Sequence, residues 1–149
     1  MAANADPVQV VQKYFDAQAR GDLDVGLTTL HDRVVFDVGR GRYDGKDAVS
    51  SFLAMLVAKN TSTVIVDMSV TPDGIVLCRL RNSDDDLRQL GIESLNLTVE
   101  VSVDDGKITR LYARPTPESL AKLETARVVG RDAEGLRLAE QAGTLPPRD

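Results

Sequence analysis

The chain has 149 residues with 42% hydrophobic and 28% charged side chains, which indicates one ordinary water-soluble domain. Its net charge of −5 argues against nucleic acid and membrane surfaces as partners, because both of them attract a basic stripe. One cysteine and one histidine exclude a disulfide framework and a Cys/His metal site, and the lack of a signal peptide or of an apolar run of about 20 residues predicts a cytoplasmic protein.

Two helices are expected at the start of the chain. Asp6 and Pro7 are residue types favoured at the cap and the first turn of a helix, and Gly21 is typical of a helix end. Asp22 is placed to cap a second, shorter helix. Helical spacing gives the first helix an apolar face with Tyr14 at its margin, and the second helix a face that extends to Leu30. These apolar positions are Val8, Val11, Phe15, Ala19, Leu23, Leu27 and Leu30.

The middle of the chain predicts a strand, a third helix and a hairpin. Residues 33–38 are rich in β-formers, and residues 46–58 have apolar side chains at helical spacing. Residues 63–70 and 75–82 are two β-rich runs that flank the turn Pro72-Asp73-Gly74. The acidic run Asp84–Asp86 that follows is interpreted as a solvated turn, because it lacks the alternating spacing of a calcium loop.

The clearest pattern in the sequence is a long alternation of apolar and polar residues. Residues 95–103 place apolar side chains on one parity and polar side chains on the other, and residues 104–107 then turn the chain into a strand over 108–114. Such a period-2 pattern predicts a sheet with one apolar and one polar face. Helices on one face of a mostly antiparallel sheet make an α+β domain.

The end of the chain predicts further helix. Thr116 is a candidate cap for a helix after Pro117, and a weaker helix is expected over 133–142. The predicted boundary divides the chain into a domain of residues 1–126 and a C-terminal extension of residues 127–149. We expect the extension to cover the mouth of the pocket or the edge of a subunit.

Several local phrases resemble the nuclear transport factor 2-like superfamily. The phrases are Val10-Val11-Gln12-Lys13-Tyr14-Phe15, Gly21-Asp22-Leu23-Asp24, residues 30–36, residues 43–49 and Asp105-Gly106-Lys107-Ile108. The resemblance implies a cone-shaped, curved, mostly antiparallel sheet wrapped around three N-terminal helices. It also implies a deep apolar pocket and, often, a homodimer. We expect the homodimer to form through the outer face of the sheet, which mixes arginines with Glu100 and Tyr112.

The superfamily includes ketosteroid isomerases, limonene-type epoxide hydrolases, SnoaL-like polyketide cyclases, scytalone dehydratases and non-enzymatic modules. Because one fold hosts many functions, the function has to be inferred from the site. The resemblance places Tyr14 where ketosteroid isomerases have the tyrosine that polarises the substrate carbonyl. The alternative for Tyr14 is a core tyrosine whose hydroxyl is bonded to a neighbour.

Asp37 is the candidate base in the sequence. Its neighbours are apolar, and burial among hydrocarbon raises the pKa of a carboxyl group toward the working range. Strand parity, however, sets Asp37 opposite to Phe36 and Val38, and an alignment without a gap puts the isomerase aspartate at Val38. The alternative is an aspartate on the outer face that pairs with an arginine.

Neither known set of catalytic residues is present in full. The second acid of the isomerases falls near Val99, and the Asp-Arg-Asp set of the epoxide hydrolases falls near Asn82, Leu80 and Ala113. Inward parity and the resemblance together give the expected substrate-binding residues. They are Phe36, Val38, Leu80, Asn82, Leu97, Val99 and Ala113.

Two hypotheses follow from these residues. The first is a small enzyme of the isomerase, cyclase or epoxide-opening type, without metal or cofactor, that acts on an apolar, oxygen-bearing small molecule. Tyr14 would donate a hydrogen bond to the substrate, and Asp37 would move a proton. The second is a non-catalytic module of the same fold that binds an apolar ligand or dimerises.

Overall fold

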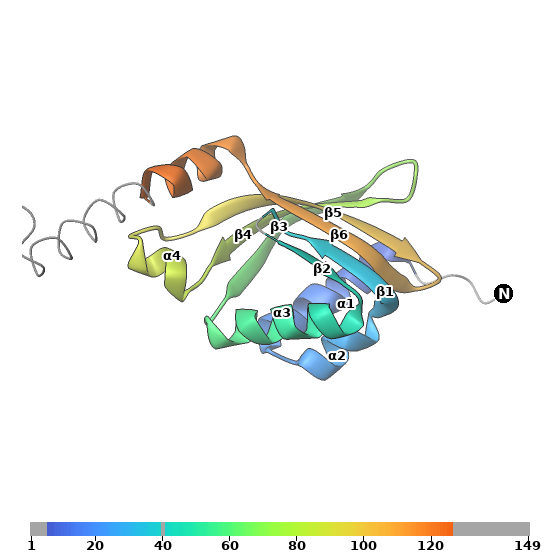
Figure 1. Ribbon diagram of the computed structural model, residues 1–149. Helices are drawn as coiled ribbons and strands as arrows, with labels where there is room; N and C mark the ends of the chain where they lie inside the picture. Colours follow the sequence, from blue (N-terminus) through green and yellow to red (C-terminus); the bar gives the residue numbers. More distant parts are fainter. Residues whose placement is uncertain (1–5, 40, 127–149) are drawn as a thin grey trace, which may run out of the picture.

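The computed structural model describes residues 6–39 and 41–126 and confirms an α+β domain. The helices are α1 (Pro7–Arg20), α2 (Leu23–Thr28), α3 (Lys46–Ala58) and α4 (Asp85–Gln89), and residues 117–126 are also helical. Helices α1, α2 and α3 lie beneath one face of a curled sheet (Figure 1). The strands are β1 (Leu30–Asp37), β2 (Arg42–Asp44), β3 (Ser62–Val70), β4 (Val76–Ser83), β5 (Leu95–Asp104) and β6 (Lys107–Pro115).

The six strands form one sheet in the order β2-β1-β6-β5-β4-β3. β1 and β6 are parallel, and every other neighbouring pair is antiparallel. The long alternation identified in the sequence corresponds to β5 and β6, which pair over almost their whole length. The faces of β5 and β6 that point toward the helices are therefore apolar.

The ends of the first helix are set by local chemistry. The carboxylate of Asp6 accepts a hydrogen bond from the backbone N–H of Val8 at 3.0 Å, which satisfies one free donor of the first turn. Gly21 ends α1 with φ at 69°, a left-handed conformation that favours glycine. These contacts confirm the predicted helix start and end.

The first strand begins earlier than the sequence pattern indicated. We expected Leu30 in the second helix, but α2 ends at Thr28 and Leu30 is the first residue of β1. Leu30 pairs with Ile108 of β6, and both side chains are buried. Pairing with a strand far along the chain overrides the local helical spacing.

Two short elements were absent from the predicted set. β2 pairs with β1 at the edge of the sheet. α4 forms where we expected a solvated turn, because the carboxylate of Asp84 accepts a hydrogen bond from the N–H of Leu87 at 2.8 Å and caps the helix. α4 and the helical residues 117–126 lie at the same end of the sheet (Figure 1), where Leu87 and Leu123 share a small apolar cluster.

The structure describes only the first part of the C-terminal region in which we expected helices. The hydroxyl of Thr116 accepts a hydrogen bond from the N–H of Ser119 at 3.3 Å, at the start of the helical residues 117–126. The predicted helix over 133–142 and the proposed extension of residues 127–149 lie outside the described residues.

The core lies between the helices and the concave face of the sheet. Val11, Phe15 and Leu30 are buried together with Val101 of β5. Phe52 and Leu56 of α3 pack against this core but are only partly buried. Both of them border a cavity, as described below.

Replacing Leu30 by alanine is expected to lower the free energy of unfolding by about 2–5 kcal/mol, the usual range for a buried leucine. Leu30 is 1% exposed and anchors β1 against β6. Urea denaturation measures the loss, with Leu120→Ala as control because Leu120 is 42% exposed. A loss for Leu30→Ala as small as that of the control would contradict the register of β1.

Candidate functional site

A cavity of about 810 Å³ lies between the curled sheet and the helices α1, α3 and α4. Small-molecule sites occupy about 300–1,000 Å³, so the cavity is large enough for a ligand. Most of the wall is hydrocarbon. The described part of the C-terminal helix contributes Leu120 and Leu123 to the lining.

The structure brings the expected substrate-binding residues together. Alternate residues of a strand share a face, so one face of β4, β5 and β6 supplies most of them. Side chains from β1 and from the residue after it complete the set. The residues that line the cavity include Phe36, Val38, Leu80, Asn82, Leu97, Val99 and Ala113.

Tyr14 of α1 lines the same cavity and is 1% exposed. Its ring packs edge-to-face on Phe15 at 4.9 Å and on Phe36 at 5.8 Å between centroids, which fixes the ring. No hydrogen bond joins its hydroxyl to another described residue, and the fully buried side-chain atom without a partner in the described part is the hydroxyl of Thr61, not that of Tyr14. Burial raises the pKa of the phenol above its usual value, so the hydroxyl stays protonated. Tyr14 is thus a neutral donor that lacks a protein partner within the described ranges.

Asp37 does not line the cavity. It stands opposite Tyr112 in the β1–β6 register, on the outer face of the sheet. Its carboxylate oxygen lies 3.1 Å from the guanidinium of Arg114, which itself stacks over the Tyr112 ring. The hydrogen bond from Arg114 lowers the pKa of Asp37. A general base instead needs a pKa raised toward the working pH. Asp37 therefore has the alternative position considered above, on the outer face and paired with an arginine. We no longer consider it a candidate base.

Replacing Asp37 by asparagine is expected to reduce the loss of stability on acidification and to leave ligand binding unchanged. Because the pKa of Asp37 is lowered in the folded state, its stabilising effect is present above the ordinary carboxyl pKa and is lost as the pH falls through the folded value. Thermal melting between neutral and acid pH measures the effect. The control is Asp73→Asn, because Asp73 has no ion pair with a described residue. If the melting temperature of Asp37→Asn falls with acidification as much as that of wild type, the stabilising pair of Asp37 with Arg114 is contradicted.

The acidic groups that do line the cavity come from the start of α4. Asp84 and Asp86 both border it. The Asp86 carboxylate is paired with the ammonium group of Lys59 at 2.7 Å. Asp84 uses one carboxylate oxygen to cap α4, and its second oxygen makes no hydrogen bond with a residue of the described ranges. Asp84 is therefore the half-buried cavity carboxylate without an ion pair among the described residues, whereas Asp86 is exposed and paired with Lys59.

Sequence reasoning missed Asp84, although a signal for it existed. The inward parity of β4 runs from Leu80 through Asn82 to Asp84, and all three line the cavity. The backbone of Asp84 is still extended, with φ −156° and ψ 179°, so the alternation continues one residue beyond the strand. The composition of the acidic run predicts a solvated turn, whereas the parity of β4, extended through the run, points to the cavity.

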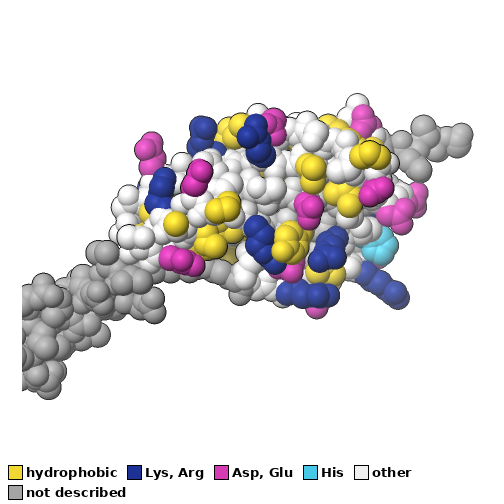
Figure 2. All heavy atoms as spheres, turned by 90° about the horizontal axis from the view of Figure 1, so that it is seen from above, with side chains coloured by type: hydrophobic (Ala, Val, Ile, Leu, Met, Phe, Trp, Pro, Cys, Tyr) yellow, Lys and Arg dark blue, Asp and Glu magenta, His cyan; other side chains and the backbone are white. Residues whose placement is uncertain are grey.

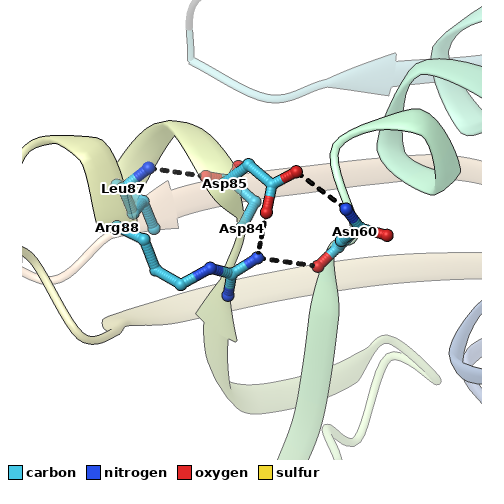
Figure 3. Close-up of polar contacts among 5 residues, drawn as sticks. All are labelled: Asn60, Asp84, Asp85, Leu87 and Arg88. Carbon is cyan, nitrogen blue, oxygen red and sulfur yellow. Dashed lines mark hydrogen bonds and ion pairs between the residues drawn. The ribbon is translucent and has the colours of Figure 1, made fainter.

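Polar contacts attach α4 to the end of α3 beside the cavity (Figure 3). The Asn60 side-chain amide donates to the Asp85 carboxylate at 2.7 Å, and the Arg88 guanidinium donates to the same carboxylate at 2.5 Å. The backbone N–H of Asp85 also donates to the carbonyl of Lys59. The hydrogen bonds from Arg88 and Asn60 lower the pKa of Asp85. These contacts fix the position of Asp84, which begins the same helix.

The outer face of the sheet is polar and mixed in charge. Seen from above, side chains of both signs are interspersed with apolar ones (Figure 2). Arg79 pairs with Asp67 across β3 and β4 on this face. Among the described residues, no cluster of His, Cys, Asp or Glu is arranged to hold a metal ion. No helix of the described part is long and apolar enough to cross a membrane.

Comparison with known proteins identifies the domain. The family model of the SnoaL-like domain matches residues 11–111. No curated protein matches the sequence significantly.

Solved structures share the fold at low sequence identity. A candidate polyketide cyclase from Sinorhizobium meliloti is 24% identical, with a TM-score of 0.63 over 71% of this chain and 94% of that protein. The epoxide hydrolase/cyclase-like enzyme SalBIII, which is connected with pyran ring formation in salinomycin, is 17% identical, with a TM-score of 0.67 over 76% and 92% of the two chains. A candidate ketosteroid isomerase from Kribbella flavida is 16% identical, with a TM-score of 0.64 over 74% and 78%.

Proposed function

The chain belongs to the SnoaL-like domain family, and we propose that its cavity binds an apolar small molecule whose oxygen accepts a hydrogen bond from Tyr14. The observation that carries this proposal is the Tyr14 side chain at the cavity wall, whose hydroxyl has no hydrogen-bond partner among the described residues. A ligand oxygen that accepts a hydrogen bond from this hydroxyl gains affinity, because one such bond contributes about 0.5–1.5 kcal/mol.

We further propose that the bound molecule is converted by acid–base chemistry without a cofactor. The free oxygen of Asp84 takes a proton from a carbon next to the substrate oxygen function. The electron pair of that C–H bond moves toward the carbonyl, and the Tyr14 hydroxyl stabilises the negative oxygen that results. Return of the proton to a different carbon completes an isomerisation. Alternatively, the enolate carbon attacks a second carbonyl of the substrate, whose C=O π electrons move to its oxygen, and that oxygen takes the proton from Asp84 as the ring closes.

The names of the similar structures support this class of reaction. They include a candidate polyketide cyclase, an epoxide hydrolase/cyclase-like enzyme and a candidate ketosteroid isomerase. Each of these reaction types needs a group that polarises oxygen and a group that moves a proton. We assign these two roles to Tyr14 and Asp84, which both line the cavity.

A second candidate function is ligand binding without catalysis. It is favoured by the state of the carboxylates at the cavity, because Asp86 is paired with Lys59 and Asp84 caps a helix. The remaining wall is mostly hydrocarbon. In this case Tyr14 would still orient the ligand.

Hydrogen–deuterium exchange of an apolar ketone separates the two functions. Beta-tetralone, a bicyclic ketone with an acidic CH₂ group beside its carbonyl, is incubated with the protein in deuterium oxide and followed by NMR. Enzymatic chemistry predicts exchange faster than in buffer with the same concentration of acetate. Saturable binding with exchange at the buffer rate would support the binding function and would contradict catalysis.

We also propose that two copies of the chain associate through the outer face of the sheet. This face carries Arg79, Glu100, Arg110 and Tyr112, a mixture of charged and aromatic side chains suited to a polar interface. Sedimentation velocity at tens of micromolar is expected to give a dimer, because a standard-sized interface persists at that concentration. A species of monomer mass would overturn this assembly, and an Arg110→Glu variant that still forms the dimer would place the interface elsewhere.

A further inference from the structure

A second polar feature of the cavity is a chain of hydrogen bonds that joins three elements. The side-chain amide of Gln18 in α1 donates to the hydroxyl of Thr63 in β3 at 3.0 Å. That hydroxyl donates to the amide oxygen of Asn82 in β4 at 2.7 Å. Gln18 and Asn82 both line the cavity, and Thr63 lies between them.

The direction of these two hydrogen bonds determines which atoms of Gln18 and Asn82 are left for a ligand. A threonine hydroxyl has a single proton, and Thr63 gives it to the oxygen of Asn82. The NH₂ group of Asn82 is therefore left as a donor, and the carbonyl oxygen of Gln18 is left as an acceptor. Neither of these atoms makes a hydrogen bond with another described residue. The cavity wall thus presents one donor and one acceptor beside each other.

The position of this pair relative to Tyr14 follows from helix geometry. Gln18 comes four residues after Tyr14 in α1, so the two side chains lie on the same face one turn apart. Side chains at this spacing have Cβ atoms about 5–6 Å apart. Asn82 reaches the same place from the sheet, two residues after Leu80 on the inward face of β4.

We infer that the ligand is difunctional: it carries a second oxygen group, a hydroxyl, about one helical turn from the oxygen bound by Tyr14. A hydroxyl complements the pair fully, because its oxygen accepts from Asn82 and its proton is donated to Gln18. Thr63 is a positioning residue, since it orients both amides without lining the cavity. This inference rests on the proposed function, because it requires a ligand in the same cavity.

The binding test compares naphthol with the dihydroxynaphthalene isomers, whose second hydroxyl lies at different distances from the first. One neutral hydrogen bond contributes about 0.5–1.5 kcal/mol, so at least one isomer is expected to bind about fivefold more tightly than naphthol. Fluorescence titration gives both dissociation constants. The ratio of the two constants is the readout, because a general loss of stability affects both ligands alike.

Three variants locate the second hydroxyl. Asn82→Leu and Thr63→Val are expected to reduce the ratio to about one, and Thr63→Ser, which keeps the hydroxyl, is expected to retain it. Thr98→Val is the matched control, because Thr98 is exposed on β5. If the hydrogen bonds from Gln18 through Thr63 to Asn82 serve only to attach α1 to the sheet, Thr63→Val will lower the melting temperature. The ratio of the two dissociation constants will then stay unchanged.

The possible failures are distinguishable. The inference is overturned if no isomer binds more tightly than naphthol, or if Asn82→Leu keeps the advantage of the second hydroxyl. Either result leaves the proposed function intact when naphthol still binds and Tyr14→Phe weakens it. Absence of naphthol binding, or equal naphthol affinity in wild type and Tyr14→Phe, overturns the proposed function and the inference with it.

Discussion

Replacing Asp84 by asparagine is expected to reduce the exchange rate of bound beta-tetralone at least about 100-fold, because a general base contributes about 10²–10⁴ to a rate. An amide cannot take up the proton. Asparagine caps helices as well as aspartate does, so the hydrogen bond from Leu87 and the position of α4 are preserved. The rate is measured by NMR in deuterium oxide with saturating ketone.

The matched control for Asp84 is its neighbour at the cavity. Asp86→Asn removes an equal charge and breaks the ion pair with Lys59, which is partly exposed and contributes little to stability. We expect Asp86→Asn to exchange protons at nearly the wild-type rate. Equal rates for wild type and Asp84→Asn, with the protein folded and the ketone bound, would remove Asp84 as the base.

Replacing Tyr14 by phenylalanine is expected to lower the same exchange rate about 100–1,000-fold, the usual effect of removing one donor to a developing oxyanion. The free energy of unfolding is expected to stay equal or to rise. The reason is that the hydroxyl has no partner among the described residues, so its removal breaks no hydrogen bond within that part of the protein. Kinetics and urea denaturation measure the two effects on the same preparation.

Tyr43→Phe is the control for this variant. Tyr43 also lines the cavity, where its ring packs against Phe52 at 4.6 Å between centroids. The change is chemically identical but lies at a different part of the wall. A loss of about 1 kcal/mol in Tyr14→Phe, with little change in exchange, would instead indicate a core tyrosine whose hydroxyl is bonded in the folded protein.

The fold could be predicted because its main signals are local and periodic. Asp6 and Gly21 define the first helix, and the alternation through β5 defines both faces of the sheet. Helical spacing predicts Leu30 in a helix, whereas its partner in the structure, Ile108, lies far along the chain. No local pattern contains that pairing, and only the assembled sheet decides it.

The apolar part of the site could be predicted for the same reason, since parity along β4 and β5 places Leu80 and Val99 at the cavity. The acid could not be identified in this way. Asp37 has apolar neighbours in sequence, but its spatial neighbour is Arg114, which follows it by 77 residues. Asp84 lies in a run of three acids whose composition suggests solvent, and only its extended backbone and its role as a cap place it at the cavity.

The infrared carbonyl stretch of beta-tetralone bound in the cavity tests the central claim most directly. A hydrogen bond from the Tyr14 hydroxyl weakens the C=O bond, so the account predicts a frequency below that of the ketone in hydrocarbon solvent. The same measurement in Tyr14→Phe is predicted to move the frequency back toward the hydrocarbon value. A bound ketone with the hydrocarbon frequency in wild type, or with the same lowered frequency in both proteins, would contradict the assignment of Tyr14 as the group that polarises the ligand.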